Sequence, residues 1–166
     1  MRTAHKLAAC LAIALAAASA ATAAPPREGI LAPGRSLGGV RLGLTPAQVR
    51  AHWGSSYGVC RDCARTTWYF TYKPFTQKGA GVEFRRGRVS AVFTLWAPKG
   101  WRSTKGLRID EPEASVTDLY GALPRTECGT YSALLQRRRG VRTAFYVVSG
   151  RVWGFAILSP GAVACR

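Results

Sequence analysis

Two short segments of the chain carry the apolar spacing of a helix that packs on one face. Val49 and Trp53 lie four residues apart, and Val116 and Tyr120 repeat this spacing further along. Side chains four positions apart share one face of a helix, so each pair is predicted to pack a short helix against a sheet.

Both segments also carry the signals that begin and end helices. Thr45 is suited to cap the first helix, and Pro46 can follow it because the first helical position needs no amide hydrogen bond. Gly54 and Gly121 can take the left-handed conformation that ends a helix. In the second segment the acidic residues of 110–113 lie where the helix dipole favours negative charge.

Segments with the composition of strands follow each predicted helix. They are rich in β-branched and aromatic residues, and turns of Arg and Gly separate them. We therefore expect an α+β fold of two tandem units, each a helix followed by a three-stranded antiparallel meander, with the helices on one side of the sheet. The predicted strands are residues 66–72, 82–84 and 88–96 in the first unit, and residues 131–136, 141–148 and 151–158 in the second.

An internal repeat supports the division into two units. Residues 39–54 align without gaps on residues 106–121, and the Gly-Arg-Val triplet at 87–89 recurs at 150–152. The predicted organisation is a signal peptide at residues 1–23, a flexible N-terminal segment at 24–38, the first unit at 39–96, a linker at 97–105 and the second unit at 106–166.

The first residues have the pattern of a cleaved export signal. Arg2 and Lys6 precede an apolar run over residues 7–18, and Ala-Thr-Ala at 21–23 fits a signal peptidase site. Cys10 ends a lipobox-like Leu-Ala-Ala-Cys, but it comes before the apolar run, so lipidation is not expected. We predict a secreted, extracellular protein with no membrane span in the mature chain.

Four cysteines remain after this leader. An even number in an exported chain favours disulfides, and we favour the pairs Cys60–Cys63 and Cys128–Cys165 over pairing between the units. Cys60 and Cys63 also have the C-x-x-C spacing of a thiol-disulfide oxidoreductase, which is the alternative function. A redox motif needs a helix N-terminus to activate its thiol, whereas this one follows a helix and leads into a strand.

Little in the chain suggests catalysis. His52 is the one histidine outside the leader, and its counterpart in the second unit is the apolar Leu119. From this one histidine no Ser-His-Asp arrangement can be assembled. The cysteines lack the second short spacing of a zinc site. We expect no enzyme activity, no catalytic residue, no cofactor and no metal.

The charge of the chain points to an anionic partner. The sequence holds 24 Lys and Arg against 8 Asp and Glu, a formal charge of +16. Arginines cluster at two predicted hairpin tips, and guanidinium groups bind phosphates and carboxylates through paired hydrogen bonds. An anionic surface polymer is one expected partner, with no sequence-specific recognition of nucleic acid. A solvated surface without a designated ligand is the other interpretation. The candidate residues are Arg85, Arg86, Arg88, Arg137, Arg138 and Arg139.

Aromatic residues give a second candidate surface. Trp68, Phe70 and Tyr72 alternate along one predicted strand, so their side chains share one face of it. Such a face is suited to bind a protein partner if it is exposed. It forms a second layer of the core if it is covered, and the oligomeric state stays open.

The residues from Gly39 to Gly54 (GVRLGLTPAQVRAHWG) resemble the opening of the units in the β-lactamase inhibitor protein family and the related SmpA/OmlA (BamE-like) lipoproteins. Those units begin with Gly-Met-Thr and a Gln-Val helix that ends at Gly. The resemblance implies a secreted tandem repeat with helices on one side of a curved sheet, and a cysteine after each helix, as at Cys60 and Cys128. Leu44 replaces the usual Met, residues 110–112 depart from the motif, and no inhibitory contact residue can be carried over.

Overall fold

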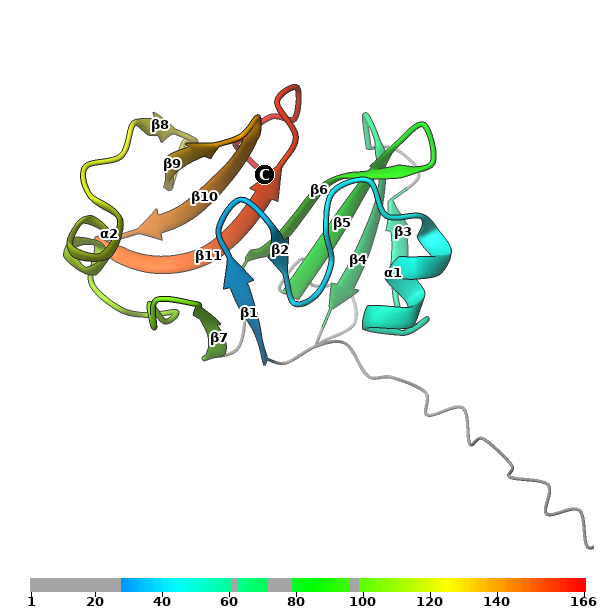
Figure 1. The fold of residues 1–166 in the computed structure, drawn as a ribbon, viewed down its shortest axis with the longest axis horizontal. Helices are drawn as coiled ribbons and strands as arrows, with labels where there is room; N and C mark the ends of the chain where they lie inside the picture. The colour runs from blue at the N-terminus through cyan, green and yellow to red at the C-terminus, as the bar shows by residue number, and fades with distance from the viewer. Residues whose placement is uncertain (1–27, 61–62, 72–78, 96–98) are drawn as a thin grey trace, which may run out of the picture.

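A single antiparallel sheet forms the centre of the computed structural model, which describes residues 28–60, 63–71, 79–95 and 99–166 (Figure 1). Its strands are β3 (Gly58–Cys60), β4 (Thr66–Thr71), β5 (Gly79–Arg85), β6 (Arg88–Leu95), β8 (Arg125–Glu127), β9 (Ser132–Arg138), β10 (Val141–Val148) and β11 (Arg151–Leu158). The eight strands lie in the order β3-β4-β5-β6-β11-β10-β9-β8. The chain therefore runs from one edge to the middle, crosses to the other edge, and returns to the middle.

The predicted α+β fold of two helix-plus-meander units is wrong. The described residues are mostly strand, and four strands of one continuous sheet follow each helix. The extra strands β3 and β8 have only three residues each, which is too short for a pattern of alternation to reveal. Pairing of β6 with β11 joins residues 91–95 to 154–158, and no local signal encodes such a contact.

A smaller sheet forms from segments that the sequence predicted to be a flexible N-terminal segment and a linker. It consists of β1 (Glu28–Ala32), β2 (Ser36–Leu37) and β7 (Gly100–Ser103), with β1 antiparallel to β2 and parallel to β7. Leu31, Leu37 and Trp101 are fully buried. Burial of these three large apolar side chains accounts for the order of segments whose short strands give no clear sequence signal.

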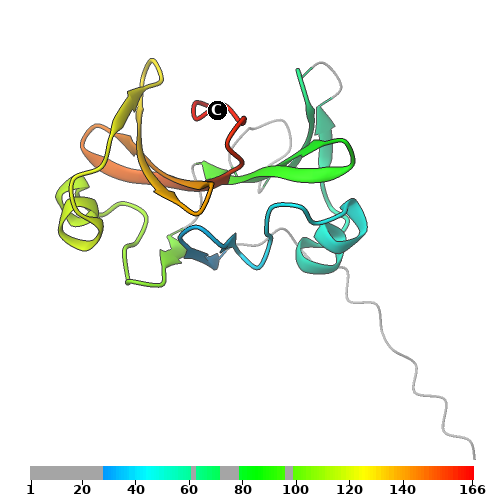
Figure 2. The same ribbon diagram turned by 45° about the horizontal axis from the view of Figure 1, so that its top comes forward.

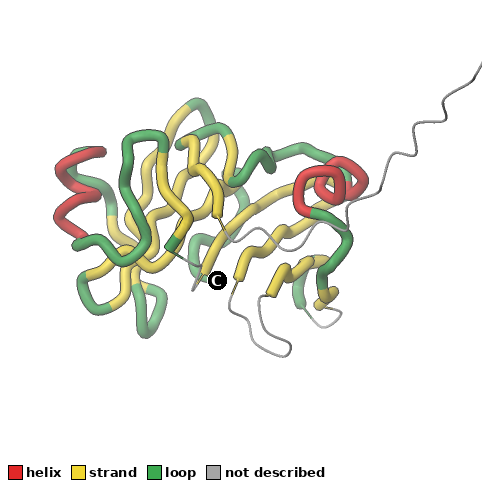
Figure 3. The backbone as a smooth tube through the Cα atoms, turned by 90° about the horizontal axis from the view of Figure 1, so that it is seen from below, coloured by secondary structure: helices red, strands yellow, loops and turns green. Residues whose placement is uncertain are grey.

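Two helices occur in the described residues, α1 (Pro46–Trp53) and α2 (Glu113–Tyr120), at opposite sides of the molecule (Figure 1, Figure 3). Thr45 caps α1 as predicted, and its hydroxyl accepts a hydrogen bond from the Gln48 amide at 3.3 Å. The Gln48 side chain accepts in turn from the Thr45 amide, which completes a capping box. Neither helix has the length and apolar composition needed to cross a membrane.

Replacing Thr45 by alanine is expected to destabilise the protein by about 1 kcal/mol, because the first turn of α1 loses its side-chain acceptor. Urea unfolding followed by circular dichroism measures the change. Thr126→Ala is a suitable comparison, since Thr126 lies on the edge strand β8 and caps no helix. Equal stability of Thr45→Ala and the unmodified protein would contradict the capping role.

The sheet separates two layers of apolar side chains. Both helices and the smaller sheet cover one face, over a core that includes Trp53, Phe70 and Phe145. The other face is concave, and the chain after β11 lies within its hollow (Figure 2). Ala162 and Ala164 of this C-terminal segment pack there against Tyr131 and Tyr146. The concave face is thus partly filled by the protein itself.

Candidate functional site

The two arginine-bearing hairpin tips lie at the same end of the sheet. Leu158, near the end of β11, pairs with Ala91 of β6 and with Arg142 of β10. Because both neighbours run antiparallel to β11, β6 and β10 both begin at the end of the sheet where β11 finishes (Figure 1). The β5–β6 tip and the β9–β10 tip are therefore presented together, which the sequence alone could not establish.

Backbone geometry holds both tips tight. Arg86 and Gly87 have φ values of 52° and 69°, and Arg139 and Gly140 have values of 47° and 76°. Two consecutive residues of positive φ form the turn that matches the twist of paired strands, and glycine takes the second position without strain. All six predicted arginines at these tips are exposed.

Two hollows flank the β9–β10 tip, and Arg138 lines both of them. The first has a volume of about 340 Å³, and Arg137, Arg139 and Arg142 also line it. The second has a volume of about 320 Å³ and adds Arg35 and Lys105 to Arg138. No carboxylate from the described part of the chain lines either hollow, so their positive charge is not neutralised locally.

Contacts with the chain on both sides fix this arrangement. The Gly34 amide donates to Thr143 Oγ1 at 2.8 Å, which holds the β1–β2 turn and its Arg35 against β10. Arg142 donates through Nη2 to the carbonyl of Ser159 at 3.2 Å. Partial burial, and then the charges of neighbouring arginines, lower the pKa of Arg142. This direction is expected where like charges crowd together.

The aromatic surface predicted on β4 is not exposed. Trp68 is 7% exposed and Phe70 is fully buried, whereas Tyr72 lies outside the described residues. Tyr57 stacks on Trp68 with ring centroids 3.9 Å apart, and Trp53 of α1 meets Phe70 edge-on at 5.2 Å. The shared face of the strand is core because the helix covers it.

Both favoured disulfides are formed. Cys60 pairs with Cys63, and Cys128 pairs with Cys165, so pairing between the predicted units does not occur. The C-x-x-C motif connects β3 to β4 and does not begin a helix. Its sulfurs therefore lack the helix dipole that lowers a thiol pKa in redox enzymes.

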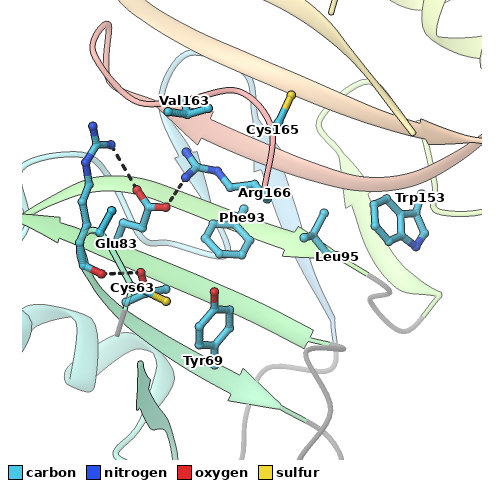
Figure 4. Close-up of a pocket in the computed structure, with 12 residues that line it drawn as sticks. Cys63, Tyr69, Glu83, Phe93, Leu95, Trp153, Val163, Cys165 and Arg166 are labelled. Atoms are coloured by element: carbon cyan, nitrogen blue, oxygen red, sulfur yellow. Dashed lines mark hydrogen bonds and ion pairs between the residues drawn. The ribbon is translucent and has the colours of Figure 1, made fainter. Parts of the chain in front are cut away.

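A pocket of about 390 Å³, which the sequence analysis did not predict, opens on the concave face (Figure 4). Glu83 of β5 lies in its wall between two arginines. Arg65 Nη1 lies 3.5 Å from Glu83 Oε2, and Arg166 forms an ion pair with the other carboxylate oxygen. Glu83 interrupts the apolar pattern of its predicted strand, which is the one signal that could have marked the pocket.

Aromatic side chains form part of the pocket floor. The ring of Phe93 covers Gly81, where a Cβ would come within 2.3 Å of it. Arg166 Cζ lies 5.2 Å from the Phe93 ring centroid, in the range of a cation–π interaction. Burial, and then the nearby carboxylate of Glu83, raise the pKa of Tyr69, while the charge of Arg166 lowers it.

No protein-family model matches the chain, and no curated protein matches it. Similar solved structures include an extracellular protein containing an SCP domain from Bacillus anthracis, with 11% identity and a TM-score of 0.52 over 71% of this chain and 44% of that one. A cysteine-rich secretory protein from Staphylococcus aureus has 15% identity and a TM-score of 0.53 over 82% and 50% of the two chains. A DUF4309 family protein from Bacillus subtilis has 10% identity and a TM-score of 0.48 over 69% and 78%.

The chain thus spans about half the length of the first and second of these proteins. At such low identity the likeness is one of fold alone. The resemblance of residues 39–54 to the β-lactamase inhibitor proteins stays a prediction.

Proposed function

We propose that this chain is a secreted, non-catalytic binding module that holds an anionic polymer against the basic end of its eight-stranded sheet. The observation that carries the proposal is that two arginine-bearing hairpin tips lie at the same end of the sheet. The β9–β10 tip is flanked there by two hollows that no carboxylate of the described residues lines. Arginine suits this role because its planar guanidinium pairs with phosphate or carboxylate through two hydrogen bonds.

Burial of the aromatic candidates supports an anionic polymer over a protein partner. Trp68 and Phe70 are part of the core, so the surface that would have bound a protein through aromatic anchors is not available on β4. The exposed arginines remain as the candidate binding surface. Without Arg2 and Lys6 of the leader, 22 Lys and Arg still face 8 Asp and Glu (24 − 2 = 22). This excess adds a long-range attraction that accelerates encounter with a polyanion and weakens with salt.

Export and the lack of catalysis rest on separate observations. The leader pattern of residues 1–23 and the two disulfides are both typical of secreted proteins. His52 is exposed on α1, and Cys60 and Cys63 are joined in the connection between β3 and β4. These features favour a binding protein over the alternative of a thiol-disulfide oxidoreductase.

The test is binding of the mature protein to long-chain inorganic polyphosphate between 50 and 300 mM NaCl. Affinity is expected to fall steeply with salt, because each phosphate contact releases a bound counterion. The variant R137S/R138S/R139S is expected to lose about tenfold or more in affinity at low salt. The negative slope of log affinity against log salt concentration should also become shallower, by about 2 to 3.

A matched control separates a site from overall charge. R41S/R102S/R108S removes three exposed arginines that line neither hollow, so its net charge equals that of the tip variant. It is expected to keep most of the affinity. Equal loss in the two variants, or binding that is independent of salt, would overturn the proposal.

A further inference from the structure

The pocket on the concave face combines an apolar floor with an excess of positive charge. Phe93, Leu95 and Trp153 line one part of it, and Arg65, Glu83 and Arg166 line another (Figure 4). Its volume of about 390 Å³ lies within the range of small-molecule sites. None of these six residues lines the two hollows at the basic end.

Among the described side chains, the charged wall holds two cationic groups and one carboxylate. Glu83 pairs with both Arg65 and Arg166, so a single carboxylate faces two guanidinium groups. The Arg166 side chain is only 5% exposed. Burial of a charge is costly unless it is fully paired, so an additional anion in the pocket would be stabilised.

The hydrogen bonds of Arg166 point the same way. Its Nη1 donates to Glu83, while Nε and Nη2 have no partner of hydrogen-bonding geometry in the described part of the chain. The Tyr146 hydroxyl lies beside the guanidinium and donates to the carbonyl of Ala164 at 2.7 Å, and its oxygen can still accept one bond from Arg166. Arg166 is therefore a buried cation whose bonding capacity is incompletely used.

Arg65 is the cation that a ligand can reach. Its side chain is 28% exposed, and its Nη2 donates to the carbonyl of Gly161 at 3.2 Å. The bonds to Glu83 and Gly161 hold the guanidinium between the sheet and the C-terminal segment. An acid group in the pocket can therefore pair with this positioned cation.

We propose that the pocket binds a small organic anion with an apolar body. The acid group pairs with Arg65, and the body lies against Phe93 and Trp153. Charge complementarity selects an anion because the described side chains of the lining include two guanidinium groups and one carboxylate. The aromatic lining selects an aryl or alkyl acid over a small inorganic ion.

The experiment compares two fluorescent probes of similar shape. 1-Anilinonaphthalene-8-sulfonate carries a sulfonate, and N-phenyl-1-naphthylamine is its uncharged counterpart. Both probes are expected to bind the folded protein at one site, and the anionic probe is expected to bind more tightly than the neutral one. Arg65→Gln is expected to lower the affinity for the anionic probe about tenfold or more and to change the affinity for the neutral probe by less than twofold.

Two further variants test the location. Val163 lines the pocket and is 60% exposed, so Val163→Trp should fold and should block both probes. Arg102→Gln removes one exposed charge on β7, on the opposite side of the sheet, and should change neither affinity. Near-ultraviolet circular dichroism checks that each variant retains its tertiary packing.

Anion binding that Arg65→Gln and Val163→Trp leave intact would overturn the inference. Equal effects of Arg65→Gln and Arg102→Gln would do the same, because they would reflect net charge alone. R137S/R138S/R139S, the variant that tests polyphosphate binding, is expected to retain its affinity for the anionic probe. Failure of one proposal is therefore distinguishable from failure of the other.

Discussion

Gly154→Ala is expected to destabilise the protein by at least about 3 kcal/mol, because the added methyl group has no space in the middle of the sheet. A Cβ at this position would lie 2.0 Å from the carbonyl oxygen of Thr94 and 3.1 Å from its carbonyl carbon. Both atoms belong to the backbone of β6. Gly154 pairs there with Leu95, and a register irregularity of β10 lies beside it. The two strands would have to separate.

Two other strand glycines calibrate this effect. A Cβ on Gly58 meets no atom within 4 Å, so Gly58→Ala should change stability by less than about 0.5 kcal/mol. The three atoms nearest to a Cβ on Gly81 all belong to the ring of Phe93, a side chain that can move, so Gly81→Ala should cost about 1 to 3 kcal/mol. Urea unfolding ranks the three variants. A cost at Gly154 no greater than that at Gly58 would mean that β6 and β11 do not approach as closely as described.

Elements that depend on neighbouring residues could be predicted from the sequence. The strand predicted at residues 151–158 coincides with β11, and the Thr45 cap, the two terminating glycines and the arginine tips were found in the same way. Each of these features depends on side chains within one or two turns of backbone. Apolar alternation, capping and turn chemistry are therefore visible in a single sequence.

Pairings between distant segments could not be predicted. The parallel contact of β1 with β7 and the antiparallel contact of β6 with β11 each join residues more than 50 positions apart. The sequence placed Trp68 and Phe70 correctly on one face of a strand. It could not say which face α1 would cover, because that depends on how the chain packs after α1.

The candidate sites show the same division. Exposure of the arginines at both tips followed from the turn signals, but their meeting at one end follows from the strand order. Arg65, Glu83 and Arg166 lie at widely separated positions of the sequence and meet only when the C-terminal segment enters the concave face. A search for local motifs cannot find such a site.

Removal of the second disulfide, in Cys128→Ser/Cys165→Ser, is expected to cost about 4 kcal/mol and to loosen the C-terminal segment. The bond closes a loop of 37 positions, and loop-closure entropy in the unfolded chain sets this magnitude. Hydrogen bonds from the hydroxyls of Tyr131 and Tyr146 to the carbonyls of Arg166 and Ala164 would still hold the segment in part. Urea unfolding and hydrogen exchange of the Ala162 and Ala164 amides measure the two effects.

Cys60→Ser/Cys63→Ser is the matched control, since it removes the same number of sulfur atoms. Its bond closes a loop of only 3 positions, so the same entropy argument gives a loss of roughly 2 kcal/mol. Faster exchange at Ala162 and Ala164 is expected only when Cys165 is released.

Val163, Cys165 and Arg166 form one wall of the concave pocket. Cys128→Ser/Cys165→Ser should therefore also weaken binding of the anionic probe. Unchanged exchange and unchanged probe affinity would show that the hydrogen bonds and the ion pair with Glu83 suffice to hold the wall, and that the disulfide stabilises the fold without shaping the pocket.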